Sequence, residues 1–232
     1  MNTASEKVET MKKLEKGFRS IGWLAMPMAL LMGGCDFDVT NPGPVQDEFL
    51  DDPDAFVAVV NGMGRALSDG MNYVAFHGAL VTRELFPTGG TGQFGISVKN
   101  GDGVLDRSEQ GAPWNNTQRS RWSAEDGLRR FGEVMSSAEF ASSEHVAMAY
   151  LWAGYANRTL GENICQAVID VGPAQPREVF LTRAQEHFSN AIEIGSAAVE
   201  TESVTAAGAV RAAVRVHLGA GSGAATDAGA VP

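Results

Sequence analysis

The sequence predicts a mainly α-helical protein, and three observations support this class. Apolar residues recur at intervals of three and four in several long stretches, which is the spacing of one helix face. No stretch alternates apolar and polar residues for long enough to predict a strand. Clusters of glycine and proline separate the periodic stretches, so we expect helices joined by loops.

The chain begins with the pattern of a secretory signal. Basic residues lead into an uncharged stretch, residues 21–32, which is followed by two glycines and Cys35. Twelve residues are too few to span a bilayer, which needs about 20. The sequence therefore predicts a signal peptide over 1–34, with either Met1 or Met11 as the start. The alternatives are a signal cleaved elsewhere, with Cys35 a plain thiol, and a buried N-terminal helix.

The composition limits the classes of partner. Residues 35–232 hold 13 basic and 25 acidic side chains, a net charge of −12. This acidic chain has no basic stripe, so we expect no nucleic-acid partner. If Cys35 is modified, Cys165 has no disulfide partner, and its apolar neighbours in 164–169 predict a small buried residue rather than a reactive thiol.

The expected body follows an extended tether. Prolines and polar residues over 35–50 disfavour a helix. Asp52 and Pro53 are typical of a helix start, and the apolar positions from Phe56 to Leu67 have helical spacing. We therefore expect the helical domain to occupy 51–232, with a second helical segment over 73–86 that ends at Pro87.

The rest of the domain alternates loops and helices. A glycine-rich stretch over 88–113 predicts a long loop, and loops of this length are often functional. Helices are expected over 114–135, 144–160, 177–198 and around 210–218, and the glycine-rich residues 219–223 are expected to form a loop.

One pair of helices has the spacing of a tetratricopeptide repeat. Ala184, Phe188 and Ala191 place an aromatic ring between two small residues, and Ala153 and Gly154 supply small residues on the preceding helix. Small residues let two helices approach closely while the ring fills the space between them. The two segments are further apart than in a plain repeat, which predicts an insertion over 162–176.

Several segments, taken in order, resemble a known family. The residues that end at Cys35 are similar to the lipobox of bacterial lipoproteins, although Met32 stands where leucine is usual. The whole set resembles the SusD/RagB family of outer-membrane lipoproteins: Cys35-Asp36-Phe37-Asp38-Val39-Thr40-Asn41-Pro42, Asp52-Pro53, His77-Gly78-Ala79-Leu80-Val81-Thr82-Arg83-Glu84-Leu85, Pro113-Trp114-Asn115-Asn116, Arg121-Trp122 and Ala149-Tyr150-Leu151-Trp152.

The resemblance implies a fold, a location and a function. It implies a SusD-like helical body with tetratricopeptide-type helix pairs, anchored in the cell outer membrane through lipid on Cys35. It also implies a surface-exposed, non-enzymatic protein that binds oligosaccharides or other nutrients and delivers them to a SusC-like TonB-dependent transporter. Family chains are longer, so we expect an N-terminal portion in which residues from 206 onward lack packing partners.

The sharpest metal-binding pattern lies in the long loop. Asn100, Asp102, Asp106 and Glu109 stand at oxygen-ligand positions of an EF-hand loop. Val98 occupies the first ligand position and cannot coordinate calcium. A polar turn stabilised by Asn and Asp side chains is the alternative, and otherwise no cofactor is expected.

Three aromatic residues are candidates for ligand contact. Phe94, Trp114 and Trp122 could stack on sugar rings, although Trp114 and Trp122 at helical spacing are typical of a core, with Trp122 on the side of Leu128 and Phe131. Trp152 is expected to pack within its helix.

Two other functions are weighed against nutrient binding. A lipidated tetratricopeptide-type scaffold would bind a protein partner. A periplasmic hydrolase would need an acid–base pair such as His77 and Glu84, but these residues are two helical turns apart, and no nucleophile signature is present. We therefore expect no enzyme.

Overall fold

The computed structural model describes residues 45–86, 103 and 111–232. The chain divides into two units, 1–46 and 47–232, and the described helices belong to the second. The signal peptide, Cys35, Phe94 and the calcium candidates Asn100, Asp102, Asp106 and Glu109 lie outside the described residues. The predicted mainly α class is confirmed.

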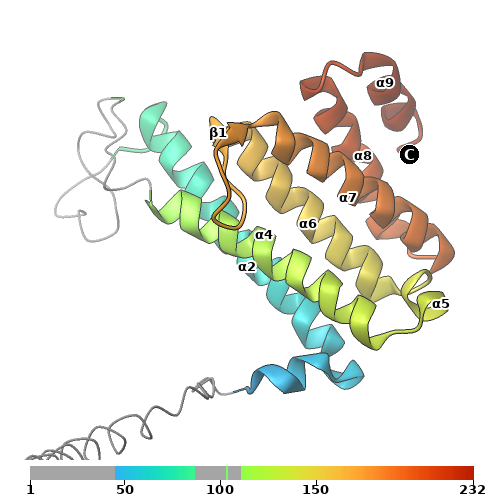
Figure 1. Ribbon diagram of the computed structural model, residues 1–232. Helices are drawn as coiled ribbons and strands as arrows, with labels where there is room; N and C mark the ends of the chain where they lie inside the picture. Colours follow the sequence, from blue (N-terminus) through green and yellow to red (C-terminus); the bar gives the residue numbers. More distant parts are fainter. Residues whose placement is uncertain (1–44, 87–102, 104–110) are drawn as a thin grey trace, which may run out of the picture. The chain divides into compact units, whose positions relative to one another are not determined.

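The second unit consists mainly of helices that follow one another along the chain (Figure 1). Its elements are the 3-10 turns η1 (Asp47–Asp51) and η2 (Pro53–Ala55), the helices α2 (Phe56–Val81), α4 (Gly111–Val134), α5 (Ser137–Phe140), α6 (Glu144–Asn163), α7 (Glu178–Ala197), α8 (Thr201–His217) and α9 (Gly221–Gly229), and the strands β1 (Gln166–Ala167) and β2 (Gln175–Pro176).

The two helical segments expected before the long loop form the single helix α2, 26 residues long. Gly70 lies in the middle of this helix, where the sequence suggests a break. A methyl group on Gly70 would lie 3.1 Å from Cα of Thr117 in α4, so the glycine allows the two backbones to approach. The helix ends at Val81, and Arg83 then adopts a positive φ of 65°.

Each long helix packs against its neighbour in the sequence. Contacts join α2 to α4, α4 to α6, α6 to α7, α7 to α8, and α8 to α9, while α6 also contacts α2 (Figure 1). The buried rings of Phe56 and Phe131 meet between α2 and α4, with centroids 4.6 Å apart. The core is therefore spread along the succession of helices, and α6 packs against α2, α4, α7 and α8.

An ionic cluster joins η1 to α4. The nearly buried guanidinium of Arg130 contacts Asp47 and Asp51 at 2.8 Å each, and Asp126 at 2.7 Å. Because Asp126 precedes Arg130 by one helical turn, the arginine is held in place within α4 while it binds η1. The start of the helical body is fastened by charge as well as by apolar packing.

The pairing of α6 with α7 follows the predicted small–aromatic–small spacing. Ala184, Phe188 and Ala191 are fully buried, and so is Ala153 in the facing helix. A methyl group on Gly154 would lie 2.5 Å from Cε1 of Phe188, so the ring lies directly on the glycine. This close approach is the physical reason for the spacing that the sequence displays.

The insertion between α6 and α7 contains a short hairpin. Strands β1 and β2 pair antiparallel, with Gln166 opposite Pro176 and Ala167 opposite Gln175. Two residues per strand are too few to produce an alternating pattern, so the sequence does not predict them. The prediction of a buried Cys165 is wrong: the thiol precedes β1 and is exposed, while Ala167 is the buried residue of this segment.

The expectation that residues from 206 onward lack packing partners is also wrong. Ala207 and Val214 are fully buried, and α8 packs on α7 and α9. The residues 219–223 form a loop only in part, because Gly219 makes the turn with a φ of 76° and α9 begins at Gly221.

A buried carboxylate holds α9 in place. Asp227, 5% exposed, accepts two hydrogen bonds from Arg211, at 2.8 and 2.7 Å, and pairs with Arg215 at 2.8 Å. Both arginines come from α8, so the ion pairs join the last two helices.

Candidate functional site

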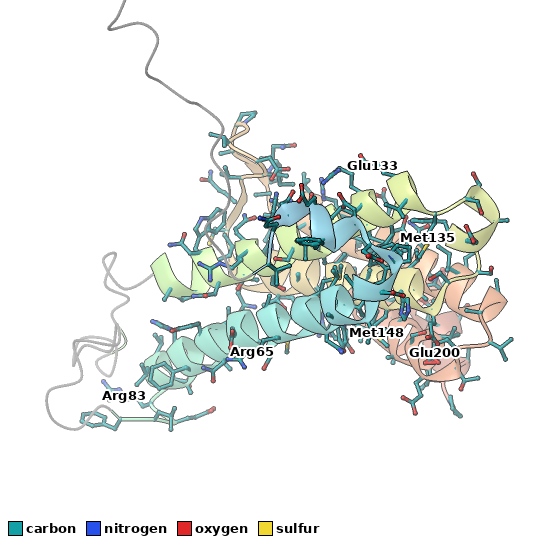
Figure 2. The ribbon with its side chains drawn as sticks, turned by 90° about the horizontal axis from the view of Figure 1, so that it is seen from below. Arg65, Arg83, Glu133, Met135, Met148 and Glu200 are labelled. Atoms are coloured by element: carbon teal, nitrogen blue, oxygen red, sulfur yellow. The ribbon has the colours of Figure 1, made fainter. Side chains whose placement is uncertain are left out.

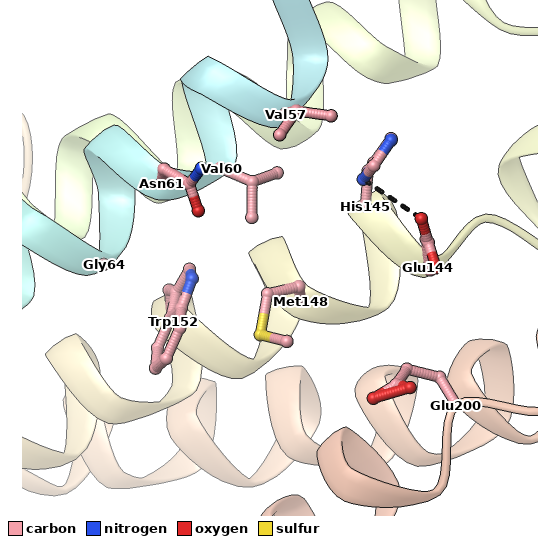
Figure 3. A pocket seen from close by; sticks show the side chains of 9 residues that line it. All are labelled: Val57, Val60, Asn61, Gly64, Glu144, His145, Met148, Trp152 and Glu200. Atoms are coloured by element: carbon pink, nitrogen blue, oxygen red, sulfur yellow. Dashed lines mark ion pairs between the residues drawn. The ribbon is translucent and has the colours of Figure 1, made fainter.

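A groove of about 340 Å³ lies between α2, α6 and the residue before α8 (Figure 3). Figure 2 gives a second view, in which Met148 and Glu200 lie near each other at one end, Arg65 lies on α2, and Arg83 lies just beyond the end of α2. The lining has apolar residues and polar ones. The apolar residues are Val57, Val60, Gly64, Met148 and Trp152, and the polar residues are Asn61, Glu144, His145 and Glu200.

Trp152 gives the groove its aromatic surface. The indole is partly buried and packs against the core on both sides of α6, as the sequence predicts, but it also lines the groove. A methyl group on Gly64 would lie 3.3 Å from Cε2 of the indole, so this glycine leaves space beside the ring. Val60 and Met148 extend the apolar surface (Figure 3).

Polar groups surround this apolar surface. Glu144 and His145 come from the first turn of α6, with Glu144 Oε1 and His145 Nδ1 4.0 Å apart. Glu200 is the N-cap residue of α8, and Asn61 comes from α2. Carboxylate, imidazole and amide groups around an aromatic ring can hydrogen-bond hydroxyl groups while the ring contacts an apolar face.

Neither Trp114 nor Trp122, the two tryptophans that the sequence suggests as ligand contacts, lines the groove. Trp114 packs against the buried cluster of Leu160, Ala167 and Phe180, which is a core contact. Trp122 is 55% exposed on α4 and does not line the groove. The expectation that Trp122 shares a side with Phe131 is wrong, because nine residues place them half a turn apart on a helix.

A second group of polar residues lies between α4, α6 and α7, centred on Glu125. Its Oε1 accepts a hydrogen bond of 2.9 Å from Asn157 and lies 3.4 Å from His187 Nε2. Its Oε2 lies 2.6 Å from Arg121 and 2.8 Å from Arg183. Arg121 also contacts Asp170 in the hairpin at 2.7 Å, so three helices and the hairpin meet in one ionic network.

The surroundings of Glu125 keep it ionised. Burial raises the pKa of this carboxyl, but hydrogen bonds from His187, Arg183 and Asn157 and the charge of Arg121 lower the pKa well below its ordinary value. A carboxylate held in this way is a poor proton donor at neutral pH. We therefore assign the network to the joining of helices.

The sequence contains only part of the signal for this network. Arg121 and Glu125 are four residues apart, which is the spacing of an ion pair on one helix turn. Asn157 and His187 come from other helices, so their approach to Glu125 depends on the packing of α4, α6 and α7.

The imagined acid–base pair of His77 and Glu84 is not brought together. His77 is 4% exposed within α2, and its Nδ1 lies 2.7 Å from the carbonyl oxygen of Tyr73. Glu84 follows the end of α2 and is exposed. No hydrogen bond joins the two side chains among the described residues.

Within the described part of the chain, no three His, Cys, Asp or Glu side chains gather in a group that could hold a metal ion. Gly103, at the glycine position of the calcium pattern, has a φ of 81°, which suits both an EF-hand loop and a polar turn. Among the helices described for this chain, none combines the length and apolar character needed to cross a membrane.

Comparisons with known proteins give no relative for this chain. No family model matches it, and neither a curated protein nor a solved structure does.

Proposed function

We propose that this chain is a lipid-anchored, non-catalytic binding protein of the SusD/RagB kind. It captures oligosaccharides at the outer membrane and passes them to a SusC-like TonB-dependent transporter. The observation that carries the proposal is the groove between α2 and α6, which has the indole of Trp152 on one side and the polar side chains of Glu144, His145 and Glu200 on the other (Figure 3).

The groove suits a sugar ring in size and chemistry. Its volume of about 340 Å³ falls within the range of small-molecule sites, about 300 to 1,000 Å³. One face of a pyranose is apolar and stacks on an aromatic ring, while its hydroxyl groups require hydrogen-bond partners at the edges. Hydrogen-bonding groups are supplied on the lining of the same groove by Asn61, Glu144, His145 and Glu200.

The fold supports binding without a large rearrangement. Trp152 belongs to α6, and α7 packs against another side of the same helix. The indole is therefore held on a rigid element, which lowers the entropy lost when a ligand binds.

The alternative is a lipidated tetratricopeptide-type scaffold that binds a protein partner. The observation in its favour is the packing of Phe188 on Gly154 between α6 and α7, since this is the contact that such repeats use. A scaffold of this kind would retain a partner protein in a pull-down and would bind no oligosaccharide.

Isothermal titration of the protein with malto-, cello-, xylo- and chito-oligosaccharides tests the main proposal. Val57 lines the groove and is 55% exposed, so Val57→Arg should fill the groove without disturbing the core. Val216 on α8 is 65% exposed outside the groove, and Val216→Arg is the matched control.

We expect at least one oligosaccharide to bind wild type and Val216→Arg equally. Val57→Arg should bind it at least about tenfold more weakly, a loss of about 1.4 kcal/mol. If no oligosaccharide binds, or if both variants bind like the wild type, the groove is not a glycan site.

The anchor is tested separately. Cys35→Ala should abolish membrane partitioning and the mass of attached acyl groups, both of which we expect in the wild type. A wild-type product that remains unmodified would remove the membrane from the proposal and leave the groove's ligand unaffected.

A further inference from the structure

The ionisable groups on the lining of the groove at Trp152 are mainly acidic. They are the carboxylates of Glu144 and Glu200 and the imidazole of His145, and the described lining contains no lysine or arginine. The contact between Glu144 and His145 is long, with 4.0 Å between Oε1 and Nδ1. A ligand that enters the groove therefore meets two carboxylates and no permanent positive charge.

The backbone of Glu200 is held in place while its carboxylate is left for the groove. Its N–H donates to the carbonyl oxygen of Gly195 at 2.8 Å, and its carbonyl oxygen accepts a hydrogen bond of 3.2 Å from the hydroxyl of Ser203. Although Glu200 is the N-cap residue of α8, its side chain makes no capping hydrogen bond. Glu200 is half-buried, and Figure 3 shows its carboxylate extending from the turn before α8 toward Met148.

The turn that carries Glu200 is strained. Val199 adopts a φ of 59°, in the left-handed region that β-branched residues rarely enter. Its side chain is 82% exposed, so its own packing does not offset this cost. Strained backbone of this kind is found preferentially where a fold presents a group to a ligand. Here the group that the turn presents is the carboxylate of Glu200.

We infer that the groove selects amino-sugar oligosaccharides, with a protonated amine of the ligand bound to the carboxylate of Glu200 and a sugar ring in contact with the indole of Trp152. This inference rests on the proposed function and names the class of sugar. A neutral sugar removes water from the carboxylates without supplying a charge, whereas an ammonium group makes charge-assisted hydrogen bonds, about twice as strong as neutral ones. An acidic sugar would bring a like charge to the groove and should be rejected.

Cellotetraose and the tetramer of glucosamine form a matched pair of probes. They have the same linkage and differ in whether each ring carries a hydroxyl or an amine at one position. The acetylated glucosamine tetramer keeps the nitrogen and removes the charge. By isothermal titration of the full chain at about pH 6, where the amine is protonated, we expect the glucosamine tetramer to bind at least about fivefold more tightly than either neutral tetramer.

Two variants with the same net charge separate the groove from the acidic surface as a whole. Glu200→Gln should lower the preference for the amine at least about threefold. Glu193→Gln, at an exposed residue of α7 that does not line the groove, should leave the preference unchanged. Circular dichroism of both variants verifies that they fold like the wild type.

The outcomes distinguish the inference from the proposed function. If a neutral oligosaccharide binds as tightly as the glucosamine tetramer or more tightly, the inference is overturned and the proposed function stands. A preference that survives Glu200→Gln, or that falls equally in Glu193→Gln, would also overturn the inference, because it would then come from the overall charge of the chain. If no oligosaccharide binds, both the proposed function and the inference fail.

Discussion

On two sides of helix α6 an aromatic ring packs against a glycine, and the two contacts differ in how closely the ring approaches the glycine. Toward α7, Phe188 lies so close to Gly154 that an added methyl group would approach its ring to 2.5 Å. Toward α2, the corresponding distance between Gly64 and the ring of Trp152 is 3.3 Å. Phe188 is fully buried, whereas Trp152 is partly buried and lines a groove.

The comparison shows how one contact type can either close an interface or leave a surface for a ligand. At Gly154 the ring fills the space between two helices completely, so the contact stabilises the fold. At Gly64 the ring of Trp152 keeps accessible surface, and polar side chains line the same groove. The first interface determines stability, and we propose that the second determines binding.

The largest expected effect comes from opening the closed interface. Phe188→Ala leaves a cavity between α6 and α7 and should lower the free energy of unfolding by about 3 to 5 kcal/mol. Urea denaturation followed by circular dichroism measures the loss. Phe49→Ala is the control, because this ring is 55% exposed and its removal should change stability by less than about 0.5 kcal/mol. Equal effects of the two substitutions would contradict the closed-interface account.

The next largest effect concerns the ionic network centred on Glu125, between α4, α6 and α7. Glu125→Gln leaves Arg121 and Arg183 without their carboxylate and should cost about 3 kcal/mol at pH 7. Because the folded pKa of Glu125 is lowered, its contribution is present above the unfolded pKa and is lost as pH falls toward the folded pKa.

Denaturant titrations from pH 7 to pH 3 test this dependence. The wild type should lose stability below about pH 4.5, the ordinary value for this carboxyl, and Glu125→Gln should have a shallower slope in that range. Glu133→Gln, at a side chain 62% exposed, should behave like the wild type. A slope in Glu125→Gln as steep as that of the wild type would show that the network does not stabilise the fold.

A smaller effect separates the two glycines directly. Gly154→Ala forces the Phe188 ring to move and should destabilise the protein by about 1 to 3 kcal/mol. Gly64→Ala would place its methyl group 3.3 Å from the indole of Trp152, which would have to shift slightly. The gain in helix propensity offsets most of this crowding, so we expect a change below about 1 kcal/mol.

For ligand affinity we expect the larger effect from Gly64→Ala, the reverse of the order expected for stability. Gly64→Ala narrows the groove beside Trp152 and should weaken oligosaccharide binding, whereas Gly154→Ala lies in the closed interface and should leave the affinity of the folded protein unchanged. Thermal unfolding measures the loss of stability in each variant, and isothermal titration measures the loss of affinity. If both variants lost stability and affinity in parallel, the two glycines would not have the separate roles that we assign to them.

The smallest effect provides the baseline for these substitutions. Gly62 is exposed in α2, and an added methyl group would meet no atom within 4 Å. Gly62→Ala should therefore stabilise the protein by about 0.5 to 1 kcal/mol through helix propensity alone. If Gly62→Ala destabilised the protein, the gain in helix propensity that we assume for glycine-to-alanine substitutions in these helices would be wrong.

Much of the helical body could be predicted because its signals are local. The spacing of Ala184, Phe188 and Ala191 predicts a close helix pair, and the helix expected over 144–160 matches α6 with an end extended to Asn163. The continuity of α2 could not be predicted in this way, because the close packing of Gly70 on Thr117 of another helix leaves no local pattern in the sequence.

The candidate site was less accessible to sequence reasoning. Trp152 was expected to pack and does so, but its exposure to the groove depends on Gly64, which is almost 90 residues away in the chain. Glu200 reaches the rim because α7 returns the chain to the start of α6. Contacts between distant segments leave no periodic pattern, so the groove could be found only once the helices were packed.

The most direct test of the central proposal is the NMR response of the tryptophan indole N–H groups as an oligosaccharide is titrated into the protein. If the groove is the binding site, the indole signal of Trp152 should shift with ligand concentration, while that of Trp122, which is exposed on α4, stays in place. A shift at Trp122 with Trp152 unchanged, or no shift at either residue, would contradict the assignment of the groove as a sugar-binding surface.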